Sequence, residues 1–542
     1  MRKYFSEYKG LTSYWVIVTI FTSIVNIYSQ KLKGNILDIA LSNEYSLLKN
    51  TVIILLISII LTSCLEFYNS VIRDRLIIKV MLSLKADFFK SLFSRSHKEF
   101  EELSEGDIIA KYTKQMMTIR TEYLAMGLLF LQYLILIISV TISMTLINIP
   151  ITIVSIILLF APMLTTKYFE AKLSKATKEE VEANQDHLKI VSGILKGIEA
   201  VKNYGIEDKI IKKYDKSNKI YKDMHAKENQ VNSVTIGMSF FTSFAAQIIV
   251  TIYAAYMVYK GIISSGDFVT MIALVGVLKV PIYWLSNLYR SVILSKPSRQ
   301  SIIRFIEEGY KKDIKEKIDI NINKYNIKYK DIDFSYGDQK LIQNLNMDLE
   351  ENTINLIIGE SGCGKSTAIK LLLGFIESKK GEILIGDHSV KNIKNLSSFF
   401  TIAKQEAFLF NGSMRENISL FEDISDDQII EILKKVGLER YADRESLDIE
   451  IKESGNNFSG GEKKRISLAR ALLRKSPILI LDEPLANIDE NNMNLIEDLI
   501  LSIKDRTVII ISHQFTKEKL DQFDKIYEFK GGMANEVYLE RK

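Results

Sequence analysis

A glycine-rich stretch in the second half of the 542-residue chain has the spacing of a phosphate-binding loop. Residues 359–367 read Gly-Glu-Ser-Gly-Cys-Gly-Lys-Ser-Thr, between a short, largely apolar run that predicts a strand and a run that predicts a helix. Glycines let the backbone wrap closely around phosphates, so that N–H groups and the helix N-terminus face the anion. A chance glycine-rich turn is the alternative, but it does not explain the strand and helix on either side. The predicted nucleotide-binding residues are Gly359, Glu360, Ser361, Gly362, Cys363, Gly364, Lys365, Ser366 and Thr367.

Two carboxylates follow a second apolar strand and add hydrolytic chemistry to this site. Residues 478–481 are all Ile or Leu, and Asp482 and Glu483 come directly after them. Open α/β sheets bind ligands at the carboxyl ends of their strands. We expect Asp482 and the hydroxyl of Ser366 to hold Mg²⁺, Lys365 to reach the β- and γ-phosphates, and Glu483 to polarise the attacking water. Together with a phosphate loop, the pair predicts hydrolysis of a nucleoside triphosphate.

Between these two elements lies Phe458-Ser459-Gly460-Gly461-Glu462, followed by a basic helix at 463–474. This motif resembles the LSGGQ signature of the ATP-binding cassette (ABC) family, with Phe and Glu at its outer positions. The resemblance implies that Ser459, Gly460 and Gly461 contact the γ-phosphate of ATP bound to a partner cassette.

Other positions also match the family, in family order. Tyr336 is where the family stacks an aromatic ring on adenine, and Gln405 matches the Q-loop glutamine that joins the Mg²⁺ site to the membrane domain. Residues 408–418 look like the exporter-type version of that region. Asp489 matches the D-loop aspartate, although the residues before it depart from the usual pattern, and His513 matches the switch histidine that contacts the γ-phosphate. A structural histidine is the alternative for His513 alone.

Six apolar runs of about the length needed to span a membrane precede this soluble half. They lie at residues 11–29, 51–72, 124–148, 149–169, 231–259 and 268–294. Any one run could be a buried core helix, but six within 300 residues favour membrane spans. The basic N-terminus and the long basic links at 73–123 and 170–230 place both termini in the cytoplasm under the positive-inside rule, although lysines at 31, 33 and 49 fit it less well.

The predicted fold class is therefore a membrane all-α domain of six helices followed by a C-terminal α/β P-loop NTPase domain. We expect the transmembrane domain at 1–300, a linker at 301–326 and the nucleotide-binding domain at 327–542. The first apolar run has no small-residue cleavage site behind it, so we interpret it as a span that is retained rather than a signal peptide.

Composition excludes several other classes. The 47% hydrophobic content excludes a disordered chain, and the dispersed net charge of +5 gives no reason to expect a nucleic-acid partner. Two cysteines, Cys64 and Cys363, cannot form a disulfide framework. The many Ile, Lys and Asn residues suggest an AT-rich bacterial source.

Over its whole length the chain resembles an exporter-type ABC half-transporter of the plasma membrane. The resemblance implies ATP and Mg²⁺ as cofactors, and a dimer with a second copy or a related half-transporter. It also implies short helices near 97–102 and 198–205 that press on the cassettes. Peptide, lipid and hydrophobic small molecules are all possible cargo, and a peptide or bacteriocin exporter without its own leader peptidase is one form. An ATP-gated channel, or a sensor that uses the cassette as a switch, is the alternative.

Two ionisable residues, Glu66 and Lys279, fall inside predicted spans. Counted from the presumed outer ends, both lie near the middle of the bilayer, where a charge is costly unless it faces a cavity or a partner. We expect them to line or gate the transport path, an ion pair between them being one arrangement. A span boundary shifted by one turn, or a structural pair between helices, is the alternative.

Overall fold

The computed structural model describes residues 1–542 apart from 43, 96, 311–318, 323, 338, 453–454, 487, 489, 514 and 538–542. It divides the chain into two compact units. We call Met1–Ser94 with Leu103–Lys311 the helical unit, and Arg95–Glu102 with Lys312–Lys542 the α/β unit. Each is described by itself.

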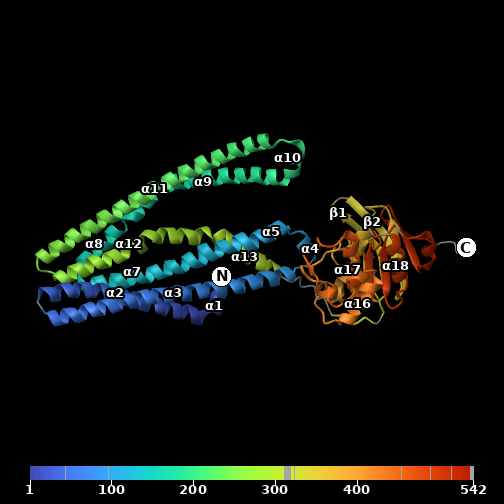
Figure 1. The fold of residues 1–542 in the computed structure, drawn as a ribbon, viewed down its shortest axis with the longest axis horizontal. Helices are drawn as coiled ribbons and strands as arrows, with labels where there is room; N and C mark the ends of the chain where they lie inside the picture. Colours follow the sequence, from blue (N-terminus) through green and yellow to red (C-terminus); the bar gives the residue numbers. More distant parts are fainter. Residues whose placement is uncertain are drawn as a thin grey trace. The chain divides into compact units, whose positions relative to one another are not determined.

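The helical unit consists of long helices that pack along one another (Figure 1). α2 packs against α3, α7 and α12, while α9 packs along α11. In chain order the helices are α1 (Arg2–Glu7), α2 (Lys9–Leu41), α3 (Tyr45–Phe93), α5 (Glu105–Ala110), α6 (Met116–Thr118), α7 (Met126–Ile147), α8 (Ile149–Leu159), α9 (Ala161–Lys196), α10 (Ile198–Tyr204), α11 (Glu207–Tyr259), α12 (Ser265–Leu294) and α13 (Lys296–Tyr310). Two π-helical stretches, η1 (Lys111–Gln115) and η2 (Ile119–Ala125), join α5, α6 and α7 into one continuous rod.

Among the described residues, five helices are long and apolar enough to cross a membrane. They are Lys9–Leu41, Tyr45–Phe93, Glu105–Ile147, Glu207–Tyr259 and Ser265–Tyr310. The difference from the six predicted runs lies at 149–169, where α8 ends at Leu159 and α9 begins at Ala161. Pro162, in the first turn of α9, has no N–H to donate to the preceding turn and therefore interrupts the helix there.

Two of these helices continue far beyond any bilayer. α3 has 49 residues and α11 has 53, so at about 1.5 Å per residue each is about 70–80 Å long, against about 30 Å of hydrocarbon. The predicted spans at 51–72 and 231–259 are therefore only parts of these two helices. α3 contains neither Gly nor Pro, so nothing in its sequence ends the helix at the membrane boundary.

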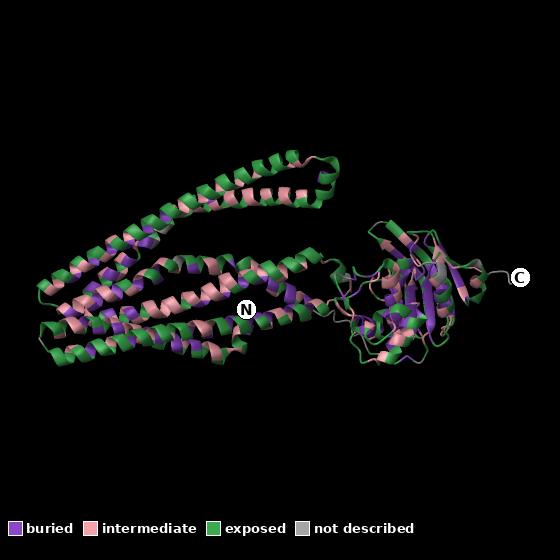
Figure 2. Ribbon diagram, in the orientation of Figure 1, coloured by how far each residue is buried: buried purple, intermediate pink, exposed green. Residues whose placement is uncertain are grey.

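Exposed residues run along the outer faces of these helices (Figure 2), and many of them are apolar. On α3, Leu56, Ile57 and Ile60 are 57%, 59% and 64% exposed, and on α11, Ile252 is 66% exposed. Faces of this size are not left in contact with water in a monomeric soluble protein. They are suited to contact with lipid or with other membrane helices.

Close backbone packing joins α2 to the start of α12. A Cβ atom on Gly34 would lie 2.2 Å from the carbonyl oxygen of Gly266, so neither position has room for a side chain. Asp38 accepts hydrogen bonds from the Ser264 hydroxyl at 2.8 Å and the Gly266 N–H at 2.7 Å. Asp38 therefore caps α12 from a neighbouring helix.

α13, at the start of the predicted linker, packs against α3 in the helical unit. The ring of Phe305 stacks on that of Phe88 at 4.5 Å, and Gly309 lies directly against the Ser91 backbone. The polypeptide therefore leaves the helical unit only after this helix.

The α/β unit contains two larger sheets. The six-stranded sheet has the order β12-β11-β3-β10-β9-β6, and its four inner strands and β6 run parallel. Its strands are β3 (Ile354–Gly359), β6 (Phe400–Ala403), β9 (Ile478–Asp482), β10 (Thr507–Ile511), β11 (Lys525–Lys530) and β12 (Met533–Glu536). The other sheet is antiparallel and has the order β2-β1-β4-β5, from β1 (Ile327–Tyr336), β2 (Gln339–Leu349), β4 (Lys380–Ile385) and β5 (His388–Ser389). A third sheet pairs β7 (Gly412–Ser413) with β8 (Glu450–Ile451).

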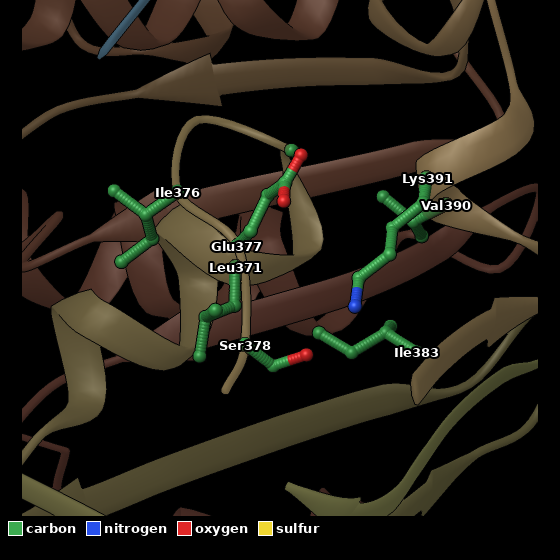
Figure 3. A pocket seen from close by; sticks show the side chains of 8 residues that line it. Leu371, Ile376, Glu377, Ser378, Ile383, Val390 and Lys391 are labelled. Atoms are coloured by element: carbon green, nitrogen blue, oxygen red, sulfur yellow. The ribbon is translucent and has the colours of Figure 1, made fainter. Parts of the chain in front are cut away.

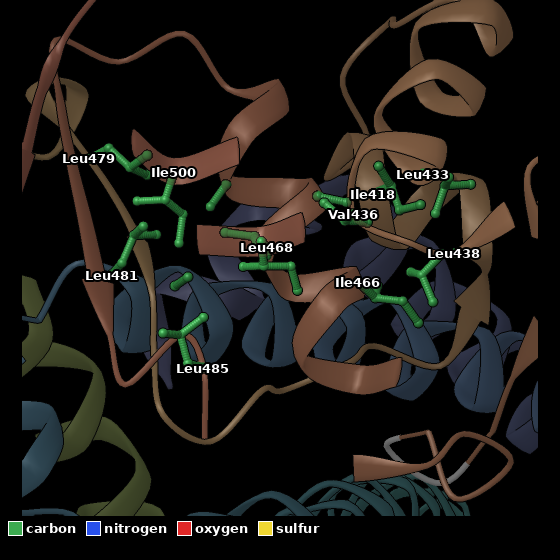
Figure 4. Packing of buried hydrophobic residues seen from close by; sticks show 14 of the residues in the cluster. Ile418, Leu433, Val436, Leu438, Ile466, Leu468, Leu479, Leu481, Leu485 and Ile500 are labelled. Carbon is green, nitrogen blue, oxygen red and sulfur yellow. The ribbon is translucent and has the colours of Figure 1, made fainter. Parts of the chain in front are cut away.

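Helices cover these sheets and close two hydrophobic cores. They are α4 (His97–Glu101), α14 (Lys365–Leu372), α15 (Met414–Ser419), α16 (Asp426–Lys435), α17 (Gly460–Leu473) and α18 (Glu490–Leu501). One core packs α15, α16 and α17 against β9, with Leu468, Leu479 and Leu481 fully or almost fully buried (Figure 4). This packing fixes α17, which carries the Ser-Gly-Gly motif, relative to the strand that carries Asp482.

Candidate functional site

The parallel order of the sheet gathers most of the predicted nucleotide site at one edge. β10 pairs with β3 on one side and with β9 on the other, and β9 pairs with β6. The glycine-rich loop follows β3, Asp482 and Glu483 end β9, His513 follows β10, and Gln405 follows β6. Because the carboxyl ends of parallel strands meet, all five elements lie at the same edge, where α/β sheets bind ligands.

The glycine-rich loop has the backbone that phosphate wrapping needs. Gly359, Gly362 and Gly364 have φ values of 142°, 83° and 111°, a region that side chains rarely allow. A Cβ atom on Gly359 would lie 2.5 Å from the carbonyl oxygen of Phe529. α14 starts at Lys365, so the loop runs directly into a helix N-terminus whose N–H groups face the same space.

The side chain of Lys365 folds back over this loop. Its ammonium donates hydrogen bonds to the carbonyl oxygen of Gly359 and, at 2.8 Å, to that of Glu360. Lys365 is 8% exposed, whereas Ser366 and Ser361 are exposed. Cys363 is half-buried, with its sulfur 3.8 Å from the Lys365 Nζ.

Asp482 and Glu483 form an electrostatically strained pair at the end of β9. Burial, together with the negative charge of Glu483, raises the pKa of Asp482 above its ordinary value, and Lys365, Lys464 and Lys404 partly offset this. Glu483 has a φ of 50°, and its N–H donates to the carbonyl oxygen of Ile511 at 2.8 Å. A cation bound at this edge would relieve the repulsion between the two carboxylates.

The signature motif lies at the N-terminus of α17. Ser459 is its N-cap: the hydroxyl accepts from the Glu462 N–H at 3.2 Å, and the Ser459 N–H donates to Glu462 Oε2 at 2.8 Å. The Tyr441 hydroxyl donates to the other carboxylate oxygen of Glu462 at 2.9 Å. Burial raises the pKa of Glu462, but the hydrogen bonds from Ser459 and Tyr441 outweigh it and leave that pKa below its usual range. Glu462, which departs from the usual Gln, therefore supports the loop as an ionised cap.

The remaining predicted residues are placed as follows. Tyr336 ends β1, is 51% exposed and forms a T-shaped contact with Phe334, with ring centres 4.9 Å apart. Gln405 and His513 are exposed. Asp489 lies outside the described residues. Among the described residues, no hydrogen bond or ion pair joins Ser459, Gly460 or Gly461 to the glycine-rich loop of the same chain.

Glu66 and Lys279 do not form the ion pair considered above. Glu66 accepts a hydrogen bond from the Gln132 amide at 3.2 Å, and Gln132 in turn accepts one from Arg73 at 3.2 Å. The Lys279 ammonium lies over the Phe244 ring, 3.2 Å from its centre. Glu66 also lies about 32 Å along α3 from Tyr45, a full hydrocarbon thickness, because the helix begins earlier than the sequence indicated.

The short helices predicted to press on the cassettes both exist as helices, α4 and α10. α4 belongs to the α/β unit, where the His97 ring stacks on Phe375 at 3.7 Å and Glu101 pairs with Lys370 at 2.9 Å. Lys370 lies in α14 and Phe375 just after it, and α14 begins at the glycine-rich loop.

A small cavity of about 30 Å³ lies away from the glycine-rich loop, beside the end of α14 (Figure 3). Leu371, Ile376, Ile383 and Val390 line it. A volume of this size holds water and no nucleotide.

Sequence analysis missed Lys464, which lies among the basic residues of the signature helix. Its ammonium donates hydrogen bonds to the carbonyl oxygens of Glu483 at 2.9 Å and Ala486 at 2.8 Å. A run of Lys-Lys-Arg at 463–465 reads as a solvated helix face, and no local pattern distinguishes its second lysine.

Comparisons with known proteins agree with this architecture. Residues 12–282 match the family model described as the ABC transporter transmembrane region, and residues 342–486 match the model described as ABC transporter. The chain belongs to the ABC transporter family, and it is a multi-pass membrane protein whose ATPase domain couples ATP hydrolysis to transport.

Relatives of similar length carry export names. A putative export ATP-binding/permease protein of Rickettsia conorii is 26% identical over 520 residues, covering 93% of this chain and 89% of its own. A putative multidrug export ATP-binding/permease protein of Staphylococcus aureus is 25% identical, covering 90% of this chain and 86% of its own. A solved bacterial Atm1-family ABC exporter with ATP bound superposes with a TM-score of 0.76 at 19% identity, covering 96% of this chain and 94% of that one. The chain therefore has the exporter fold.

Proposed function

We propose that this chain is a half-transporter that exports a peptide, a lipid or a hydrophobic small molecule across the plasma membrane as a dimer. One observation carries this proposal: the groups that ATP hydrolysis needs meet at one edge of the sheet. They are the glycine-rich loop, Asp482, Glu483, Gln405 and His513. Export as the direction is supported by the export names of the two relatives. The multidrug name of the Staphylococcus relative favours hydrophobic cargo, while a peptide exporter remains part of the proposal.

In this proposal each nucleotide-site residue has a defined role. The backbone of residues 359–367 wraps the phosphates, Lys365 transfers its hydrogen bonds from the loop carbonyls to the β- and γ-phosphates, and the exposed face of Tyr336 stacks on adenine. Glu483 takes the proton of the attacking water, and His513 contacts the γ-phosphate. Gln405 and Asp489 are assigned the roles that the family resemblance implies for the Q-loop glutamine and the D-loop aspartate.

The donor set at this edge fits Mg²⁺. Asp482 supplies a carboxylate with a raised pKa, Ser366 an exposed hydroxyl and Gln405 an exposed amide, all hard oxygen ligands of the kind that Mg²⁺ accepts with water and phosphate. When bound, the ion neutralises charge on the phosphates. Within the described residues no group of three acidic, His or Cys side chains is placed to hold a metal ion, so the proposed site depends on the hydroxyl and the amide as well.

Dimerisation follows from the position of the signature motif. Ser459 is the N-cap of α17, Ser459 and Gly460 are exposed, and among the described residues the motif makes no bond to the chain's own glycine-rich loop. A helix N-terminus attracts anions, so we assign Ser459, Gly460 and Gly461 to ATP held by a second copy or a related half-transporter. Each site then needs two chains, and ATP shifts the population towards the closed pair because it binds that state better.

For the membrane part, we propose cytoplasmic termini, a transmembrane domain at 1–300, a linker at 301–326 and a nucleotide-binding domain at 327–542. α4 and α10 would transmit motion to the cassettes, which the stacking of His97 on Phe375 supports for α4. Glu66 and Lys279 are proposed to line the transport path as separate groups rather than as a pair.

The test is transport by the purified chain in liposomes, with ATP added to the cassette side. Secreted peptides, lipids and hydrophobic drugs are supplied as separate panels, and Lys365→Ala is the control that cannot hold the phosphates. Saturable, ATP-dependent movement of one cargo class that is absent in the control supports the exporter. ATP-dependent ion conductance without cargo movement would instead establish an ATP-gated channel. If no cargo class moves and none stimulates ATP hydrolysis, the proposal of export is overturned.

A further inference from the structure

A lysine outside the predicted site holds the backbone of the proposed general base. Lys464, five residues after the signature serine on α17, donates from Nζ to the carbonyl oxygen of Glu483 at 2.9 Å and to that of Ala486 at 2.8 Å. The side chain is half-buried, and burial lowers the pKa of Lys464 even though the Glu483 and Asp482 carboxylates oppose this. An ammonium is thus kept in a desolvated position in order to bind two main-chain oxygens.

Glu483 needs such support because its backbone is unusual. Its φ of 50° is uncommon for a residue with a side chain, and that conformation is unfavourable unless its surroundings compensate. The Glu483 N–H is fixed to Ile511 in β10 at 2.8 Å, and its carbonyl oxygen accepts from both Lys464 and, at 3.3 Å, the Ala486 N–H. The peptide units on both sides of the Cα are therefore held, which fixes the direction of the Cα–Cβ bond from which the carboxylate extends.

The same lysine connects this glutamate to the signature motif. α17 begins at its Ser459 N-cap, and Lys464 is about 7.5 Å further along the same helix axis. The helix is rigid over so short a distance, so a displacement of the signature loop moves the anchor of Glu483. Ala486 extends the link to the segment that leads to α18.

We propose that Lys464 is a positioning residue that aligns Glu483 and couples engagement of the signature motif to hydrolysis in the chain's own nucleotide site. This inference rests on the proposed role of Glu483 as general base. It assigns to Lys464 no contact with ATP. Lys464 acts on the step after binding, through the orientation of another side chain.

The experiment compares Lys464→Met with the wild type in the full-length protein in nanodiscs. Methionine keeps a similar length and removes all donors. We expect kcat for ATP hydrolysis to fall about tenfold or more, while KM for ATP changes by less than about threefold. Lys464→Arg, which restores donors to both carbonyls, should recover most of kcat. Lys435→Met is the matched control, because among the described residues the ion-pair partner of Lys435 is Glu431, on the exposed face of α16.

A double variant separates positioning from a general structural effect. In a Glu483→Gln background the aligned base is already absent, so Lys464→Met should not lower the residual rate further. A further fall by the same factor would show that Lys464 acts independently of Glu483 and would overturn the inference. Wild-type kcat in Lys464→Met, or a loss explained by weaker ATP binding or a lowered melting temperature in both Lys464 variants, would overturn it as well. If Glu483→Gln alone hydrolyses ATP at the wild-type rate, the proposed function fails instead, which is a different outcome.

Discussion

Replacing Tyr441 with phenylalanine removes a single hydroxyl from the contacts that hold the signature loop. That hydroxyl donates to Glu462 Oε1 at 2.9 Å, while Oε2 of the same carboxylate accepts from the Ser459 N–H at 2.8 Å. A hydrogen bond to a charged acceptor contributes about 1.5–3 kcal/mol, and Glu462 is partly exposed, so water replaces some of the loss. We therefore expect Tyr441→Phe to destabilise the loop by about 1 kcal/mol, or about fivefold in its equilibrium constant.

The neighbouring variants set the scale for this effect. Glu462→Ala loses the cap bond to Ser459 as well, and loss of an N-terminal cap adds about 1 kcal/mol, so about 2 kcal/mol is expected in total. Glu462→Gln keeps an oxygen for the Ser459 N–H and an amide for Tyr441, and should remain close to wild type. Because Tyr441 and Glu462 interact, the double change should cost less than the sum of the single changes by about 1 kcal/mol.

The assay is ATP-dependent closure of the cassettes, followed by fluorescence transfer in the full-length protein, with thermal unfolding measured alongside. The ATP concentration needed for half-closure should rise in the order wild type, Tyr441→Phe, Glu462→Ala. Two results would refute the reasoning that Tyr441 orders the signature loop through Glu462. One is a double variant whose loss of closure equals the sum of the losses in the two single variants. The other is a closure curve for Tyr441→Phe that is identical to that of the wild type.

Further outcomes follow from other contacts. Gly34→Ala should lower the melting temperature of the membrane-embedded protein, because its Cβ would meet the Gly266 carbonyl; wild-type melting would contradict that packing. A thiol reagent should modify half-buried Cys363 and block ATP binding, and ATP should protect; full activity after complete labelling would contradict the loop's assignment. Asp482→Asn should raise the melting temperature of the nucleotide-free protein while abolishing hydrolysis. The raised pKa of Asp482 means that the folded state binds the proton of this carboxyl more tightly than the unfolded state does. The carboxyl therefore lowers the stability of the protein as pH rises through its folded pKa. An Asp482→Asn protein that melts at the wild-type temperature at pH 7 would contradict this.

The sequence predicted those parts of the site whose chemistry is local. Residues 359–367 carry their own strand, turn and helix, and Asp482 and Glu483 are adjacent, so spacing alone indicates their roles. Their meeting at one edge follows from the general geometry of parallel sheets, and the pairing of β10 with β3 and β9 brings it about. Family resemblance added the signature, whose cap on α17 is formed by Ser459 and Glu462.

Contacts between distant segments could not be predicted in this way. Lys464 and Glu483 are nineteen residues apart, and Tyr441 and Glu462 are twenty-one apart. Only the packing of α17 in the core that holds β9 and the end of α16 brings each pair together. The ion pair considered between Glu66 and Lys279 does not form, because each side chain has another partner. Apolar runs give the depth of a residue in the membrane to within a turn or two, but they do not give the direction in which its side chain leaves the helix. The continuity of α3 and the break at Pro162 likewise depend on local backbone chemistry that hydropathy does not report.

The most direct measurement of the central claim is the rate of ATP hydrolysis by Glu483→Gln beside the wild type, with ATP binding measured on the same samples. A general base contributes about 10²–10⁴-fold to such a reaction. We predict that Glu483→Gln binds ATP with wild-type affinity and hydrolyses it at least about a hundredfold more slowly. Hydrolysis by Glu483→Gln at the wild-type rate would contradict the assignment of this sheet edge as the hydrolytic site.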